Sequence, residues 1–148
     1  MVESSAFTGA LAKNPFNFEH NKLNYLSAHL DGVQYPSIPY SPDFASDQYI
    51  REYYAFFEAL NMLSTDSNMK IDRDKWKSGH TMFAFNFAPD SSEGCGSGEH
   101  VNIIRNGTMS LDMKFADALS NTINVLVYCE YDNLVEMNEN REVATDYM

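Results

Sequence analysis

The stretch TMSLDMKF, residues 108–115, alternates apolar and polar side chains without exception. Its apolar positions are Met109, Leu111, Met113 and Phe115. Successive side chains of an extended strand point to opposite faces, so this period of two predicts a strand with one buried and one solvated face. Such strands are typical of antiparallel sheets.

Three further segments are predicted to be strands. TINVLVYCEY, residues 122–131, has one apolar face and one mixed face, and predicts a central strand that is partly covered on both sides. TMFAFNF, residues 81–87, places three phenylalanines on one face before Pro89 ends it. In KLNYLSAHLDGVQYP, residues 22–36, the Asp-Gly pair at positions 31 and 32 suits a tight hairpin turn. The prolines at 36, 39 and 42 are expected to end regular structure there.

One segment predicts a helix, at about residues 47–63. Ile50, Tyr53, Phe57 and Leu60 recur there at helical spacing, with no Gly or Pro among them. Ser46 or Asp47 is expected to cap its first turn.

The order of these elements predicts a mainly β fold. The chain has 148 residues, of which 44% are hydrophobic and 14% aromatic, enough for one domain with a real core. Consecutive strands around a single helix favour an antiparallel jelly-roll β-sandwich with one inserted α-helix, spanning residues 1–148 as one domain.

Charge and composition exclude several functions. The net charge of −11 would repel nucleic acid, and no cluster of basic residues is visible to offset it. No apolar run is long enough to cross a membrane, and MVESSAFTG at the start lacks the features of a signal peptide. Only two cysteines, Cys95 and Cys129, are present, which favours a reduced, intracellular setting and leaves a disulfide between them optional.

The sequence contains no assembled catalytic, metal or cofactor motif. Its histidines are not spaced for zinc, and the acids and glycines of residues 86–100 fit neither a calcium loop nor a phosphate loop. Cys129 is predicted to be a buried, inert thiol within its strand. We therefore expect no catalysis and no cofactor; convergence of His20, His29 and a carboxylate would revive an enzyme hypothesis.

Two aromatic segments are candidates for contacts. Trp76 lies among mixed charges in MKIDRDKWKSG, where it could anchor an interface or fold back onto the core. KNPFNFEHNKLNYLS, residues 13–27, predicts an extended corner, because Pro15 disfavours helix at the residue before it. The candidate interface anchors are Phe16, Phe18, Tyr35, Tyr40 and Trp76.

Four ordered blocks resemble a known family. They are AKNPFNFEHNKLNYLSAHLDGVQYPSIPYSPDF, GHTMFAFNFAPD, the strand NGTMSLDMKF, and NVLVYCEYDNLVEMNENREVATDY. These are similar to the C-terminal half of the hexon-like major capsid protein of polinton (Maverick) elements and adintoviruses. The resemblance implies a double jelly-roll lineage, trimeric assembly with other capsid subunits, and location in a virion.

The chain departs from that family in two ways. It matches about one jelly roll, which indicates either a piece of a capsid protein or a host gene that reuses one. Asn86 stands where the family tends to have Asp, and SSEGCGSGEH is an irregular insert. We expect a structural assembly protein that acts by self-association. The alternative is a domesticated, lectin-like module that binds a protein or a ligand.

Overall fold

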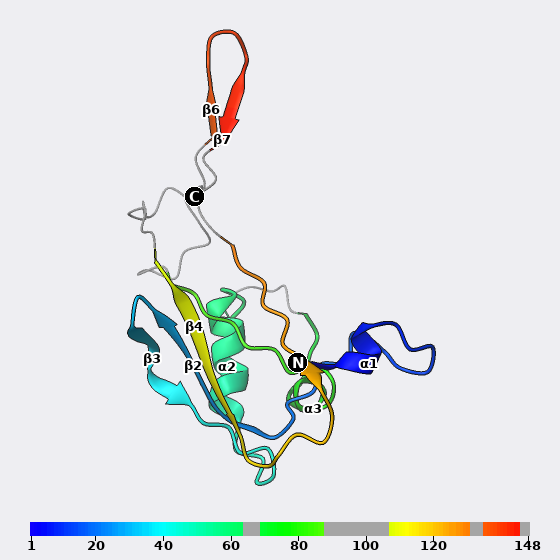
Figure 1. The fold of residues 1–148 in the computed structure, drawn as a ribbon. Helices are drawn as coiled ribbons and strands as arrows, with labels where there is room; N and C mark the ends of the chain where they lie inside the picture. Colours follow the sequence, from blue (N-terminus) through cyan, green and yellow to red (C-terminus); the bar gives the residue numbers. More distant parts are fainter. Residues whose placement is uncertain (64–68, 88–106, 131–134, 146–148) are drawn as a thin grey trace.

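A three-stranded antiparallel sheet, ordered β3-β2-β4, forms the main body of the computed structural model (Figure 1). The structure describes residues 1–63, 69–87, 107–130 and 135–145. The strands of the sheet are β2 (Leu23–Leu30), β3 (Val33–Tyr40) and β4 (Met109–Phe115). Helix α2 (Ile50–Ala59) packs on one face of the sheet, and the shorter α3 (Arg73–Lys77) lies near one end of it (Figure 1).

The alternation of β4 is confirmed. Its apolar positions are all half-buried and its polar positions are exposed. β4 pairs with β2 along seven residue pairs, and a register shift between Leu23 and Tyr25 inserts one extra residue into β2. This bulge brings Leu23 and Leu26, three residues apart, onto the same buried face.

The hairpin between β2 and β3 is also confirmed. Asp31 and Gly32 both have positive φ, 53° and 79°, as the predicted tight turn requires. The expected end at Pro36 is wrong, because β3 continues to Tyr40 after a register shift in which three extra residues bulge from it. Proline is tolerated here since β3 is an edge strand, whose outer N–H groups need no partner.

The predicted helix exists but is shorter than expected. It covers Ile50–Ala59 instead of residues 47–63, and Tyr49 begins it without a side-chain cap. Asp47 has a φ of 56°, outside the helical region, so neither Ser46 nor Asp47 caps α2. Phe56 and Phe57 face the core, whereas Ile50, expected on the buried face, is 58% exposed.

Trp76 is the centre of an aromatic core. The side chain is fully buried, and its indole N–H donates to the Met82 carbonyl oxygen at 3.1 Å. The rings around it, with centroids between 5.5 and 6.1 Å away, are those of Phe44, Tyr49, Tyr53 and Phe83. Asp72 caps α3 by accepting from the Lys75 N–H at 2.8 Å, so a short helix holds Trp76 folded back onto the core.

Two predicted strands are not formed as expected. Residues 81–87 pair with no strand among the described residues; their side chains, including Phe83 and Phe85, instead pack against the core from a partly buried segment. Within 122–130, only Ile123–Asn124 is a strand (β5), and the residues after it are exposed. The central strand fails because no neighbouring strand within the described ranges pairs with residues 125–130.

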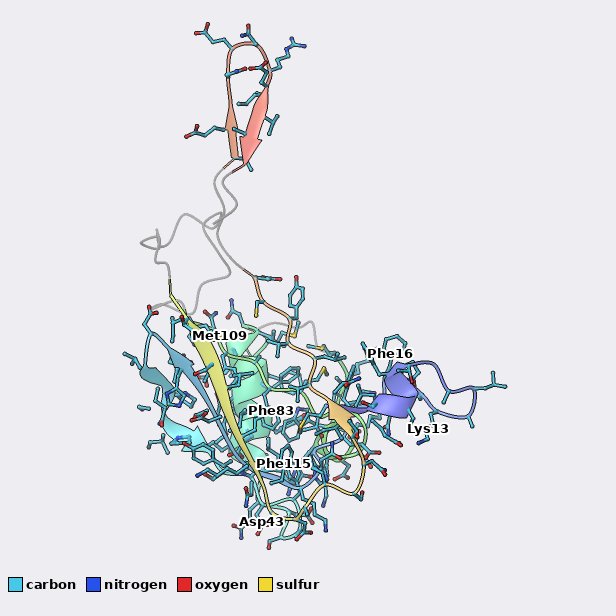
Figure 2. All side chains as sticks on the ribbon, in the orientation of Figure 1. Lys13, Phe16, Asp43, Phe83, Met109 and Phe115 are labelled. Carbon is cyan, nitrogen blue, oxygen red and sulfur yellow. The ribbon has the colours of Figure 1, made fainter. Side chains whose placement is uncertain are left out.

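The remaining elements are short. β1 (Val2–Glu3) pairs with β5, α1 (Ser4–Phe7) follows it, and β6 (Val135–Met137) pairs with β7 (Val143–Thr145). The β6–β7 hairpin stands apart from the body (Figure 1), and its described side chains point into solvent, in contrast to Phe83 and Phe115 (Figure 2). The mainly β, antiparallel character is confirmed. No helix within the described ranges has the length and apolarity needed to cross a bilayer.

Candidate functional site

The five predicted interface anchors fall into three environments. Trp76 is buried in the aromatic core, so it is not available as a surface anchor. Phe16 is 73% exposed and Phe18 is half-buried at the N-terminal corner. Tyr35 and Tyr40 lie at the two ends of the bulged part of β3 and line one hollow with residues of α2.

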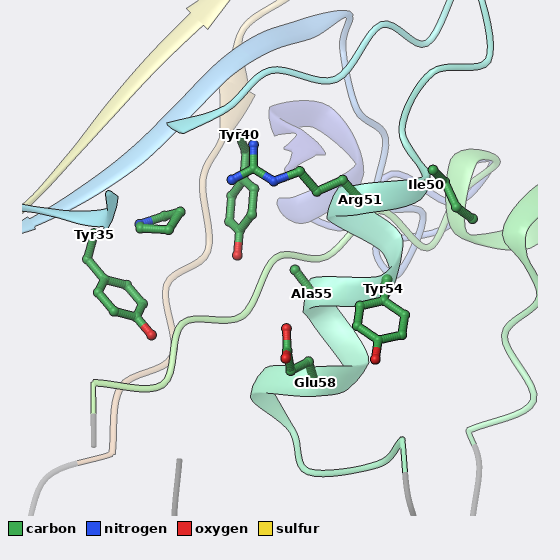
Figure 3. A pocket seen from close by; sticks show the side chains of 8 residues that line it. Tyr35, Tyr40, Ile50, Arg51, Tyr54, Ala55 and Glu58 are labelled. Atoms are coloured by element: carbon green, nitrogen blue, oxygen red, sulfur yellow. The ribbon is translucent and has the colours of Figure 1, made fainter. Parts of the chain in front are cut away.

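This hollow, which we call the tyrosine hollow, has a volume of about 500 Å³. That volume is within the range of small-ligand pockets. Figure 3 shows Tyr35 on one side and Tyr54 on the other, with Tyr40, Ala55 and Glu58 between them. The lining residues are Tyr35, Pro36, Tyr40, Ile50, Arg51, Tyr54, Ala55 and Glu58.

Arg51 and Glu52 hold the two walls of the hollow together. The Arg51 guanidinium donates to the carbonyl oxygens of Ile38 at 2.7 Å and Pro39 at 2.9 Å, and lies 5.3 Å from the centroid of the Tyr40 ring. The buried Glu52 carboxylate accepts from the Ser41 N–H at 3.1 Å. Adjacent residues of α2 thus tie the helix to the end of β3.

Tyr40 contributes its hydroxyl to the hollow. The residue is only 7% exposed, and no hydrogen bond of its hydroxyl is present within the part of the chain that the structure describes. Burial raises the pKa of Tyr40 and the nearby Arg51 opposes this shift. The phenol is therefore protonated at neutral pH and can donate a hydrogen bond to an acceptor placed in the hollow.

A second polar cluster covers the face of the sheet opposite α2. The Ser27 hydroxyl lies 3.1 Å from His29 Nε2, and Asp112 Oδ2 lies 3.3 Å from the same nitrogen. A Ser-His-Asp triad needs the acid and the nucleophile on opposite ring nitrogens. Here both contact Nε2 and Ser27 is fully buried, so the arrangement joins β2 to β4 and lacks the geometry for nucleophilic attack.

The two histidines singled out by the sequence do not converge. His20 stacks on Phe44 with centroids 3.9 Å apart, whereas His29 is bonded to Ser27 and Asp112. Burial lowers the pKa of His20, and the positive charge of Lys77 acts in the same direction. Within the described ranges no group of three or more His, Cys, Asp or Glu could hold a metal ion.

The cysteine and loop predictions have different outcomes. Cys129 is exposed with a free thiol, so its predicted burial is wrong; the strand expected to bury it is not formed. Cys95, Asp90, Glu93, Glu99 and His100 lie outside the described residues.

The corner predicted at residues 13–27 has a structural role. The Asn14 carboxamide oxygen accepts from the Phe16 N–H at 3.0 Å, the hydrogen bond of a turn. Phe18 then exchanges backbone hydrogen bonds with the segment after α3, its N–H donating to Gly79 at 2.8 Å and its carbonyl accepting from Thr81 at 2.9 Å. The corner therefore fastens the N-terminal region to the core.

Exposed apolar side chains form a third candidate surface, on the two segments after β4. Residues 125–128 follow β5, and each is at least 40% exposed. One face of the β6–β7 hairpin is similarly apolar and exposed. We call this set the C-terminal apolar surface: Val125, Leu126, Val127, Tyr128, Val135, Met137 and Val143.

Comparisons with known proteins show one distant relative and no fold assignment. The uncharacterized protein F54H12.2 of Caenorhabditis elegans is 24% identical over 151 residues, covering 99% of this chain. The chain spans 35% of the length of that relative. No protein-family model and no solved structure matches the chain.

Proposed function

We propose that the chain is a jelly-roll module of a hexon-like structural protein that acts by self-association and not by catalysis. The observation that carries this proposal is the C-terminal apolar surface, whose side chains are 40–85% exposed. Monomeric proteins rarely expose many large apolar side chains together unless a partner covers them, and here they gather on two segments, residues 125–128 and the β6–β7 hairpin. The antiparallel, mainly β architecture and the resemblance to hexon-like capsid proteins agree with this proposal.

Open strand edges would provide the second part of such an interface. β4 pairs with β2 on one side, and its other edge has no partner among the described residues. Seven residues of unpaired backbone are a template for a strand from another chain or module. The jelly-roll sandwich, the trimer and the capsid setting are parts of this proposal, with Phe16 and Phe18 as candidate contact residues.

The test is the assembly state of the full chain, measured by sedimentation and by electron microscopy of the same sample. We expect trimers or larger shells at micromolar concentration. Val127→Asp places a charge in the C-terminal apolar surface and should shift the population to monomers, and Phe16→Ala should weaken assembly less. Ser120→Asp, at an exposed polar position, is the matched control.

A wild-type chain that stays monomeric at all accessible concentrations would contradict the proposal. So would assembly that Val127→Asp and Ser120→Asp change equally, because charge alone would then account for the effect. Circular dichroism of each variant separates a lost interface from a lost fold.

A further inference from the structure

We propose that the tyrosine hollow is a peptide-binding site for a proline-rich segment in the polyproline II conformation, with a basic residue of that segment beside Glu58. The partner is therefore a basic, proline-containing stretch of another protein. This inference does not depend on self-association: the hollow lies between β3 and α2, and the C-terminal apolar surface lies on other segments.

The unpaired hydroxyl of Tyr40 is the first observation. Tyr40 as a whole residue is 7% exposed, and its hydroxyl makes no hydrogen bond to another described residue. A hydroxyl without a protein partner is free to bond a ligand group. The Tyr40 hydroxyl points into the hollow (Figure 3), so an acceptor bound there would satisfy it. A polyproline II backbone makes no internal hydrogen bonds and presents free carbonyl oxygens.

The second observation is the shape and chemistry of the walls. Tyr35 is 39% and Tyr54 is 54% exposed, and the two rings stand on opposite sides of the hollow (Figure 3). Pro36 and Ala55 form apolar lining between them. Grooves lined with aromatic rings accept proline-rich segments because these are already ordered before binding and lose little conformational entropy.

The third observation is charge. The exposed Glu58 carboxylate makes no ion pair within the described ranges, whereas Arg51 is engaged with the carbonyl oxygens of Ile38 and Pro39. A basic residue of the peptide can therefore pair with Glu58, and an acidic residue would be repelled by it. The net charge of −11 favours the approach of a basic partner over an acidic one.

The test uses the full chain and three fluorescein-labelled peptides, followed by fluorescence anisotropy. The first is PPAPPAPR, the second replaces its arginine by glutamate, and the third replaces its prolines by alanines. We expect saturable binding of the first peptide and binding of the other two that is weaker by roughly tenfold or more, as for the loss of an interface anchor.

Variants of the hollow locate the site. Tyr54→Ala should weaken binding of the arginine peptide roughly tenfold, while Phe7→Ala, which removes a similarly exposed aromatic ring from α1, should leave it unchanged. Glu58→Gln should remove the preference for arginine over glutamate, and Glu139→Gln, in the turn of the β6–β7 hairpin, should not. Tyr40→Phe removes only the hydroxyl and should weaken binding of every peptide that binds.

Several results would overturn the proposal. These are no saturable binding at millimolar peptide, equal affinity for the alanine peptide, preference for the glutamate peptide, or equal effects of Tyr54→Ala and Phe7→Ala. Perturbation of amide NMR signals outside β3 and α2 would likewise place the peptide elsewhere. Binding of an oligosaccharide instead of the arginine peptide would also count against it. Tyr54 and Glu58 are both exposed, so their variants should keep the fold. Thermal unfolding of each variant checks this.

Discussion

The sheet–helix body and the C-terminal apolar surface contain similar sequence patterns in opposite environments. In β4, alternating apolar side chains are half-buried because β2 pairs beside them and the aromatic core covers them. Residues 125–128 are apolar, and so is one face of the β6–β7 hairpin, yet these side chains are exposed. An apolar or alternating pattern therefore occurs in both environments, because burial depends on a second element that pairs with the segment or covers it.

Replacing Trp76 should give the largest difference in stability between the two regions. Trp76→Ala leaves a cavity among stacked rings and removes the indole hydrogen bond to Met82, so we expect a loss of about 3–5 kcal/mol in the free energy of unfolding. Tyr128→Ala, at a residue that is 85% exposed, should change it by less than about 0.5 kcal/mol at concentrations where the chain is monomeric. Urea denaturation followed by circular dichroism measures both. Equal losses would mean that the exposed segment is covered in the folded chain.

The same substitution, Met→Ala, can be made in both regions. Met113 is half-buried against the core and Met137 is 69% exposed. We expect Met113→Ala to lower the free energy of unfolding by about 1–2 kcal/mol, less than a fully buried methionine would. Met137→Ala should change it by less than about 0.5 kcal/mol at concentrations where the chain is monomeric. A larger loss from Met137→Ala in the monomer would contradict the exposed position of the hairpin.

One hydrogen bond links the β2–β3 turn to β4, and its contribution to the stability of the sheet can be measured. The Asp31 carboxylate accepts from the Thr108 N–H at 3.0 Å and so joins the β2–β3 turn to the start of β4. Asp31→Ala removes this bond at a position with positive φ, and we expect a loss of about 1 kcal/mol by urea denaturation. Asp31→Asn keeps an acceptor and tolerates the same backbone, so it should retain most of the stability. Equal losses for both variants would show that the hydrogen bond contributes little.

A smaller, pH-dependent effect is expected at His20. The pKa of His20 lies below its ordinary value of 6.5, because burial against Phe44 disfavours the charged ring. On acidification the unfolded chain binds a proton first, so the contribution of His20 to stability is present above pH 6.5 and decreases as the pH falls. His20→Phe keeps the stacking and should flatten the profile of unfolding midpoint between about pH 7.5 and 5.5. If the unfolding midpoint of His20→Phe depended more steeply on pH than that of the wild type, the pKa of His20 would be raised and not lowered.

Only some of the residues that line the tyrosine hollow could be predicted from the sequence. Tyr35 and Tyr40 stand out as aromatic residues among prolines, and both line the tyrosine hollow. Tyr54 and Glu58 occupy the solvent side of a helix whose buried side dominates its pattern, and nothing in their spacing points to β3. A hollow between two elements depends on how they pack, and its lining residues share no local signal.

The sequence by itself determined the elements that local physics controls. The alternation of β4, the Asp31–Gly32 turn and the helical spacing in α2 depend on backbone preferences and short-range periodicity, and all three appear in the structure. Tertiary structure alone decided that Trp76 is buried, that β3 passes through its prolines as an edge strand, and that Cys129 is exposed. Each of these outcomes depends on which segment, distant in sequence, packs or pairs with the residue. Local sequence patterns do not specify that segment.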